Sequence, residues 1–171
     1  NGSDELIGLT LKAFVEDGDE VVVARPTFLM YEVASTVHGA KLKIVPMRYF
    51  KYDLKAMKEA VTKNTKAVFI ANPDNPNGTY VSRYELEDFL RGLPEETIVF
   101  LDEAYFEFVE EQDYPNGLDY IGKNNLIVTR TFSKAYGLAG LRVGYGVSRP
   151  EIIKYMETAR EPFNVNSLAQ V

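Results

Sequence analysis

The chain of 171 residues contains no cysteine and no tryptophan, and His38 is its only histidine. Without cysteine, disulfides and thiolate metal sites are excluded, and a single histidine disfavours His-rich metal sites and His-based hydrolase chemistry. His38 stands before Gly39, which predicts a helix end near the C-terminal dipole rather than a catalytic position. No apolar run approaches the roughly 20 residues that span a bilayer. We therefore expect a protein without a membrane partner and in a cytoplasmic setting.

Basic residues are fewer than acidic ones: 19 Lys and Arg stand against 25 Asp and Glu, which gives a net charge of -6. Because nucleic acids are bound by clusters of Lys and Arg, this balance argues against nucleic acid as a partner. Hydrophobic residues make up 46% of the chain and charged residues 26%, which is ordinary for a globular domain. The length is sufficient for one domain with its own hydrophobic core.

Short apolar, β-branched runs alternate with stretches of helical periodicity. The runs predicted as strands are residues 21–24, 42–45, 67–70, 98–101 and 126–128, with a weaker sixth at 143–147 that two glycines interrupt. The helical patterns cover residues 6–15, 54–61 and 86–90. Strands that are apolar throughout are typical of a sheet buried on both faces. The alternation predicts an α/β fold with a mostly parallel sheet flanked by helices.

Two helix starts have capping residues. Ser82 is followed three residues later by Glu85, which is the pattern of a capping box. Ser3 is predicted to cap the first helix, with Asp4 and Glu5 in the first turn.

Unusual residues follow four of the predicted strands. Ligands of open α/β sheets bind beyond the carboxyl ends of the strands. The segments that follow those strands are Arg25-Pro26-Thr27-Phe28, Asn72-Pro73-Asp74-Asn75-Pro76-Asn77-Gly78, Asp102-Glu103-Ala104-Tyr105 and Thr129-Arg130-Thr131-Phe132-Ser133-Lys134. We expect these polar and aromatic groups to meet at one edge of the sheet and to form a site there.

Each segment also has a purely structural interpretation. Asn75 to Gly78 forms a good turn sequence by itself, and Asp102 with its neighbour suits a helix N-terminus. Lys134 has the usual place of a solvated surface lysine, while Phe28 and Tyr31 fit a hydrophobic core. A nucleotide-binding α/β domain is a further alternative. It is disfavoured because the glycines form neither a P-loop nor the dinucleotide fingerprint.

Taken together, the segments resemble the fold-type I aminotransferases, which depend on pyridoxal 5'-phosphate (PLP). The strings that carry the resemblance, in the family's order, are Gly2-Ser3-Asp4-Glu5, Arg25-Pro26-Thr27-Phe28, Asn75-Pro76-Asn77-Gly78, Asp102-Glu103-Ala104-Tyr105 and the run from Thr131 through Lys134 and Arg142 to Gly144. The strings extend over nearly the whole chain, and the last is highly specific. The departure is Asn77, where the family usually has threonine.

The resemblance implies a role for each residue around the cofactor ring. Lys134 would bind the PLP aldehyde covalently and then move a proton at the substrate α-carbon. Asp102 would pair with the pyridine nitrogen and keep it protonated. Tyr105 and Asn75 would hydrogen-bond the oxygen at position 3 of the ring. Phe28 would stack on one face of the ring. Lys134, Asp102 and Tyr105 are thus the predicted catalytic residues.

The resemblance also implies a phosphate site at the start of the first helix. The backbone N–H groups near Ser3 and Asp4 would bind the phosphate, because helix N-termini are natural anion sites. Thr131 and Ser133 would add hydroxyl groups, and Arg142 would add a charge-assisted contact. No metal is part of this predicted site.

For the whole protein, the resemblance implies a homodimer that takes an amino donor and a 2-oxo acid. The similarity is greatest to histidinol-phosphate aminotransferases, which implies amino transfer between histidinol phosphate and 2-oxoglutarate in histidine biosynthesis. Aromatic and other class I/II aminotransferases, threonine-phosphate decarboxylases and an inactive cofactor-binding fragment are the alternatives. Residues 1–171 are expected to form the PLP-binding large domain. The family's N-terminal segment and C-terminal small domain are expected to lie outside them, so these residues alone are not expected to transaminate.

Overall fold

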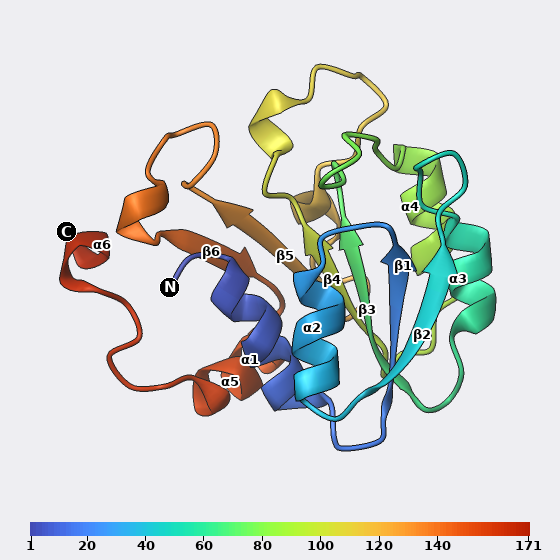
Figure 1. The fold of residues 1–171 in the computed structure, drawn as a ribbon, viewed down its shortest axis with the longest axis horizontal. Coiled ribbons are helices and arrows are strands. Elements are labelled where there is room, and N and C mark those ends of the chain that lie inside the picture. The colour runs from blue at the N-terminus through green and yellow to red at the C-terminus, as the bar shows by residue number, and fades with distance from the viewer.

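A single six-stranded sheet forms the middle layer of the computed structural model, which describes residues 1 to 171 (Figure 1). The strands are β1 (Glu20–Arg25), β2 (Lys41–Pro46), β3 (Thr65–Ala71), β4 (Ile98–Asp102), β5 (Leu126–Thr131) and β6 (Gly144–Val147). Their order across the sheet is β2-β1-β3-β4-β5-β6, and only β6 runs antiparallel to its neighbour. All six predicted strands and the mostly parallel sheet are therefore confirmed.

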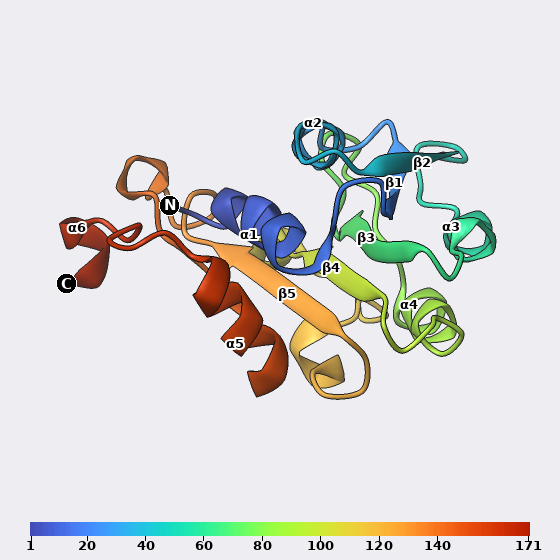
Figure 2. The same cartoon turned by 90° about the horizontal axis from the view of Figure 1, so that it is seen from below.

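Helices cover both faces of this sheet, as Figure 2 shows for α1 and α2 on one side and α3 and α4 on the other. The α-helices are α1 (Asp4–Phe14), α2 (Met30–Val37), α3 (Leu54–Ala60), α4 (Arg83–Leu90), α5 (Pro150–Ala159) and α6 (Ser167–Gln170). Three 3-10 turns lie between them: η1 (Phe106–Phe108), η2 (Gly117–Tyr120) and η3 (Ala139–Leu141). The three predicted helical patterns correspond to α1, α3 and α4. None of these helices is both long and apolar enough to cross a membrane.

The sheet separates two hydrophobic cores, because alternate residues of a strand point to opposite faces. In β1, Val21 and Val23 face the core under α1, α2 and α5, whereas Val22 and Ala24 face the core under α3 and α4. All four side chains are fully buried. Burial of an aliphatic side chain of this kind contributes about 1.5–3 kcal/mol relative to exposure, which explains why these strands are apolar throughout.

The two predicted capping residues have different outcomes. Ser82 and Glu85 form the predicted capping box at the start of α4. The prediction for Ser3 is wrong, because its side chain makes no capping hydrogen bond. Ser3 has helical dihedral angles, φ -67° and ψ -22°, whereas a capping side chain needs an extended backbone to turn towards the third helical N–H. The helix end predicted at His38 is confirmed, since His38 caps the C-terminus of α2.

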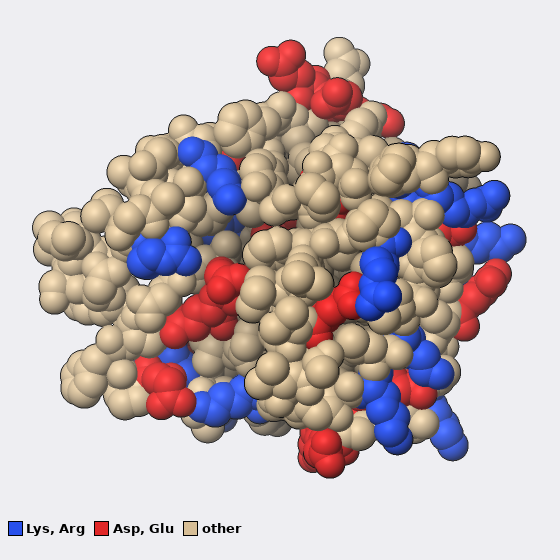
Figure 3. All heavy atoms as spheres, viewed as in Figure 1, with Lys and Arg blue, Asp and Glu red and all other residues tan.

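Charged side chains of both signs are interspersed over the face of the molecule in Figure 3. Most ion pairs are exposed, such as that between Lys12 and Glu161. Exposed pairs contribute little to stability.

One ion pair is buried, and it fastens the segment after β4 to β5. Arg130 donates to Oε2 of Glu103 from Nε at 3.0 Å and from Nη2 at 2.8 Å. The backbone N–H of Gly117 donates to the other oxygen, Oε1, at 2.7 Å. The guanidinium also lies 3.6 Å from the centre of the Phe106 ring. Burial raises the pKa of Glu103, and the Arg130 contact opposes that rise.

We expect Glu103→Gln to lower the free energy of unfolding by about 3–5 kcal/mol, because it leaves the Arg130 charge buried without a counter-charge. Denaturant unfolding measures this change, and the matched control is Glu161→Gln, which removes the exposed partner of Lys12. The control should leave the free energy of unfolding nearly unchanged. Equal effects of the two variants would contradict the importance of the buried pair.

Candidate active site

A cavity of about 200 Å³ opens at the carboxyl edge of the sheet, where the segments after β1, β3, β4 and β5 meet. Its lining includes every residue predicted for the site: Ser3, Asp4, Phe28, Asn75, Asp102, Tyr105, Thr131, Ser133, Lys134 and Arg142. Tyr31, Ala71, Pro73 and Ala104 complete the lining. Residues up to 139 positions apart in the chain thus surround one space, as the parallel topology predicted.

Asp102 is the last residue of β4 and the central acid of this cavity, and it is only 9% exposed. Its Oδ1 accepts hydrogen bonds from the Thr129 hydroxyl at 3.2 Å and from the Ala104 N–H at 3.1 Å. Its Oδ2 accepts one from the Tyr31 hydroxyl at 2.8 Å. Burial raises the pKa of Asp102, whereas these three donors lower it because they favour the charged form.

Lys134 follows β5 and also lines the cavity. Its Nζ lies 5.1 Å from the centre of the Tyr105 ring, and no carboxylate or other acceptor of the chain binds it. The backbone around it is tied down, since Gly137 N–H donates to the Lys134 carbonyl at 2.9 Å and Leu138 N–H to the Phe132 carbonyl at 3.0 Å. A primary amine without a partner on a fixed loop is available to react with a carbonyl group.

Donors for an anion gather where α1 begins. The N–H groups of Ser3 and Asp4 have no acceptor within the chain, as expected for the first turn of a helix. The Gly2 N–H donates to the Arg142 carbonyl at 2.8 Å, and this contact brings the Arg142 guanidinium beside the helix start. A Cβ on Gly144 would lie 2.5 Å from the Ser3 nitrogen, so glycine is required for β6 to pass this close.

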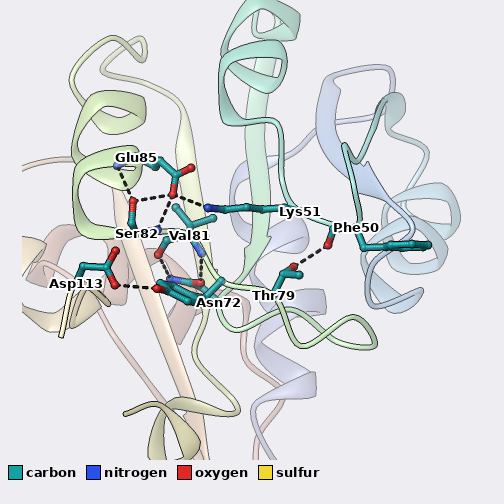
Figure 4. A network of polar contacts seen from close by, with 9 residues as sticks. Phe50, Lys51, Asn72, Thr79, Val81, Ser82, Glu85 and Asp113 are labelled. Atoms are coloured by element: carbon teal, nitrogen blue, oxygen red, sulfur yellow. Dashed lines mark hydrogen bonds and ion pairs between the residues drawn. The ribbon is translucent and has the colours of Figure 1, made fainter. Parts of the chain in front are cut away.

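A network of polar contacts that the sequence did not predict holds the loop that follows β3 (Figure 4). Its anchor is Asn72, which is fully buried. The Asn72 side chain accepts from Val81 N–H at 2.8 Å and donates to the Val81 carbonyl at 3.1 Å, which closes the loop that carries Asn75. Figure 4 also shows the capping box of Ser82 and Glu85 next to it.

Asn77, the departure from the family's usual threonine, has a role of its own in this loop. Its Nδ2 donates to Asp74 Oδ2 at 2.6 Å and to the Pro26 carbonyl at 2.9 Å. The Thr27 hydroxyl donates to Asp74 Oδ1 at 2.5 Å. Asn77 and Asp74 therefore tie the loop of Asn75 to the loop that carries Phe28.

Of the four lining residues that the sequence did not identify as functional, Tyr31 is the one whose side chain bonds to a predicted site residue. It was compatible with a simple core position, and it is indeed fully buried. No sequence signal distinguishes it, because an aromatic residue among apolar neighbours is typical of a core. Only the structure shows that its hydroxyl reaches Asp102.

The residues of the cavity fit PLP by their chemistry. A free amine, a buried carboxylate and an anion site at a helix N-terminus match the aldehyde, the basic ring nitrogen and the phosphate of that cofactor. The cavity is smaller than the roughly 300–1,000 Å³ of sites for drug-sized ligands, which suits a single substituted ring. The donor set and the size of the cavity are thus both compatible with PLP.

Comparison with known proteins shows the family to which this fold and cavity belong. The family model "Aminotransferase class I and II" matches residues 1–171, that is, the whole chain. The protein belongs to this family.

Among the curated relatives, two histidinol-phosphate aminotransferases match the chain over its whole length. The chain is 51% identical over 173 residues to a histidinol-phosphate aminotransferase of Moorella thermoacetica, covering 100% of this chain and 45% of the relative. It is 49% identical over 173 residues to histidinol-phosphate aminotransferase 2 of Carboxydothermus hydrogenoformans, covering 100% of this chain and 48% of the relative. The chain therefore spans about half the length of the curated relatives it matches.

Solved structures agree in fold. The histidinol-phosphate aminotransferase of Sinorhizobium meliloti, solved in complex with pyridoxal-5'-phosphate, superposes with a TM-score of 0.92 at 36% identity and covers 98% of this chain and 46% of that one. The L-threonine-O-3-phosphate decarboxylase of Porphyromonas gingivalis has a TM-score of 0.81 at 29% identity, with 99% and 49% covered. The fold-type I architecture is thus shared with both.

Proposed function

We propose that residues 1–171 form the PLP-binding large domain of an aminotransferase that transfers an amino group between histidinol phosphate and 2-oxoglutarate. The observation that carries the proposal is the convergence of all ten predicted site residues on one cavity, with Asp102 at the end of β4 and Lys134 in the segment after the neighbouring parallel strand β5. The names of the Moorella thermoacetica and Carboxydothermus hydrogenoformans relatives support the choice of histidinol phosphate.

In this proposal the chain binds both the phosphate and the ring nitrogen of PLP. The free N–H groups at the start of α1 and the Arg142 guanidinium bind the phosphate, with hydroxyl groups from Thr131 and Ser133. Asp102 pairs with the nitrogen of the pyridine ring. When bound, PLP supplies an aldehyde that takes up the amino group and an electron-poor ring that accepts negative charge from the substrate α-carbon.

The chain's own residues then perform three tasks. Asp102 remains ionised and keeps the ring nitrogen protonated, so that charge develops next to a fixed counter-charge. The Lys134 amine anchors the cofactor and afterwards moves a proton at the substrate α-carbon as a general base and acid. Phe28, Tyr105 and Asn75 fix the plane of the ring, because orientation supplies a large share of rate enhancement.

The proposal includes a homodimer and a cytoplasmic location, which the resemblance to the family supports. A threonine-phosphate decarboxylase is the second candidate, and the structural match to the Porphyromonas gingivalis protein favours it. Both candidates need the same cofactor cavity, so the substrate has to separate them.

A donor panel tests the proposed reaction in the full-length protein. Histidinol phosphate, tyrosine, phenylalanine and threonine phosphate are each supplied with 2-oxoglutarate, and glutamate and carbon dioxide are both measured. We expect glutamate to form fastest with histidinol phosphate and no carbon dioxide to be released. Fastest glutamate formation with tyrosine or phenylalanine would show an aromatic aminotransferase. Carbon dioxide from threonine phosphate would show the decarboxylase.

A further inference from the structure

Tyr31, near the start of α2, has a fully buried side chain with a single polar contact. Its ring stacks on Phe69 with centroids 5.2 Å apart and an interplanar angle of 14°, and it meets Phe28 edge-to-face at 5.5 Å. Its hydroxyl donates to Asp102 Oδ2 at 2.8 Å. Phenylalanine would make the same ring contacts, so the hydroxyl is the feature that packing alone does not require.

The acceptor positions of Asp102 show why this hydroxyl matters. An ionised carboxylate offers about four lone-pair positions, two on each oxygen. On Oδ1 both positions are taken, by Thr129 and the Ala104 N–H. On Oδ2 only one position is taken, by Tyr31, and Asp102 lines the cavity. Tyr31 therefore binds the oxygen that retains a free acceptor position.

The surroundings of Asp102 oppose its ionisation. Burial raises its pKa, and the carboxylate of Asp4 on α1 raises it further. The neighbouring Glu103 is paired with Arg130 and supplies no free counter-charge. Other charged or titratable groups around the pair are Tyr52 before α3, Asp74 after β3, Tyr105 after β4 and Lys134 after β5. Among the hydrogen bonds that lower the pKa of Asp102, that from Tyr31 has the largest effect.

We propose that Tyr31 is a positioning residue that keeps Asp102 ionised and turns its Oδ2 towards the ring nitrogen of the bound cofactor. Tyr31 does so through its hydroxyl, while its ring braces Phe28. This inference rests on the proposed function, because it assigns Asp102 to the ring nitrogen. It adds a residue on α2 to the strand-end and loop residues of the site.

The first test needs neither cofactor nor substrate. The carboxyl carbon of Asp102 is followed by carbon-13 NMR against pH in the cofactor-free, full-length protein, in wild type and in Tyr31→Phe. Loss of the donor destabilises the charged carboxylate, so Asp102 should titrate at a higher pH in the variant. The control is Tyr120→Phe, which removes a buried phenol that donates to Glu87 at 3.0 Å and leaves Asp102 untouched. An unchanged Asp102 titration in Tyr31→Phe would overturn the proposal.

The second test is a double-mutant cycle on kcat in the cofactor-loaded enzyme. A hydrogen bond to a charged group corresponds to roughly 10–100-fold, so Tyr31→Phe should lower kcat by about that factor and leave KM nearly unchanged. In the Asp102→Ala background the same substitution should have little further effect, because its target is gone. A full, additive effect in that background would show that Tyr31 does not act through Asp102.

A third variant keeps the inference testable if Tyr31→Phe does not fold. Replacement of Tyr31 by 3-fluorotyrosine retains the shape and strengthens the donor, so Asp102 should titrate at a lower pH than in wild type. A shift to higher pH or no shift would contradict the proposal. Failure of the donor panel, in contrast, would refute the proposed reaction and leave these NMR results unaffected.

Discussion

Replacing Lys134 with alanine in the full-length protein is expected to abolish amino transfer, with kcat lowered by about 10⁴-fold or more. On the proposed roles, the variant loses both the amine that anchors the cofactor and the base that moves the proton at the substrate α-carbon. General acid–base catalysis alone contributes about 10²–10⁴-fold. Steady-state turnover of histidinol phosphate with 2-oxoglutarate measures the loss.

The matched control for this experiment is Lys154→Ala, which removes an exposed lysine of α5 outside the cavity. We expect this control to retain wild-type kcat. The unfolding temperature of Lys134→Ala should also stay close to that of wild type, since no acceptor of the chain binds Nζ. A Lys134→Ala enzyme that turned over within tenfold of wild type would refute the assigned role.

Replacing Asp102 with alanine should lower kcat by about 10³-fold, while cofactor binding persists through the phosphate site and Lys134. Removal of one preorganised electrostatic contact to developing charge costs about 10²–10³-fold in other enzymes. The effect falls mainly on kcat, because the carboxylate is needed most where charge develops in the transition state. Asp102→Glu, which retains the charge, should be less impaired.

Asp113→Ala is a suitable control for Asp102→Ala. Asp113 lies in the exposed loop after β4, where it accepts a hydrogen bond from the Tyr80 hydroxyl at 2.8 Å. Its removal should not change kcat. Near-normal kcat in Asp102→Ala would mean that another group neutralises the ring nitrogen, and the role given to Asp102 would be wrong.

The strands and the edge of the sheet that carries the site were predictable, because both depend on residues that are neighbours in the sequence. A run such as Val21 to Ala24 is apolar throughout only when both faces are covered, and the parallel topology then brings the following segments together. Of helix α2 only the end at His38 was predicted, and the placement of its apolar residues explains why the rest was not. Val33 and Val37 are apolar but exposed, Val37 by 83%, whereas the polar Ser35 is buried, so the apolar residues of α2 do not mark its inner face.

Contacts between distant segments could not be predicted from one sequence. The bond between Tyr31 and Asp102 joins positions 71 residues apart, and the contact of Asn77 with Pro26 joins positions 51 apart. Neither partner has a sequence pattern that refers to the other. The buried pair of Glu103 and Arg130 is similar, since acidic and basic residues in a sequence are mostly exposed.

The most direct test of the account is to identify the lysine that binds the cofactor. The full-length protein is incubated with PLP, reduced with borohydride, digested and mapped by mass spectrometry. Reduction fixes the pyridoxyl group on the amine that holds the aldehyde. We predict that the group is found on Lys134 and that Lys134→Ala abolishes this labelling. A pyridoxyl group at a defined different lysine, with Lys134 unmodified, would contradict the central assignment.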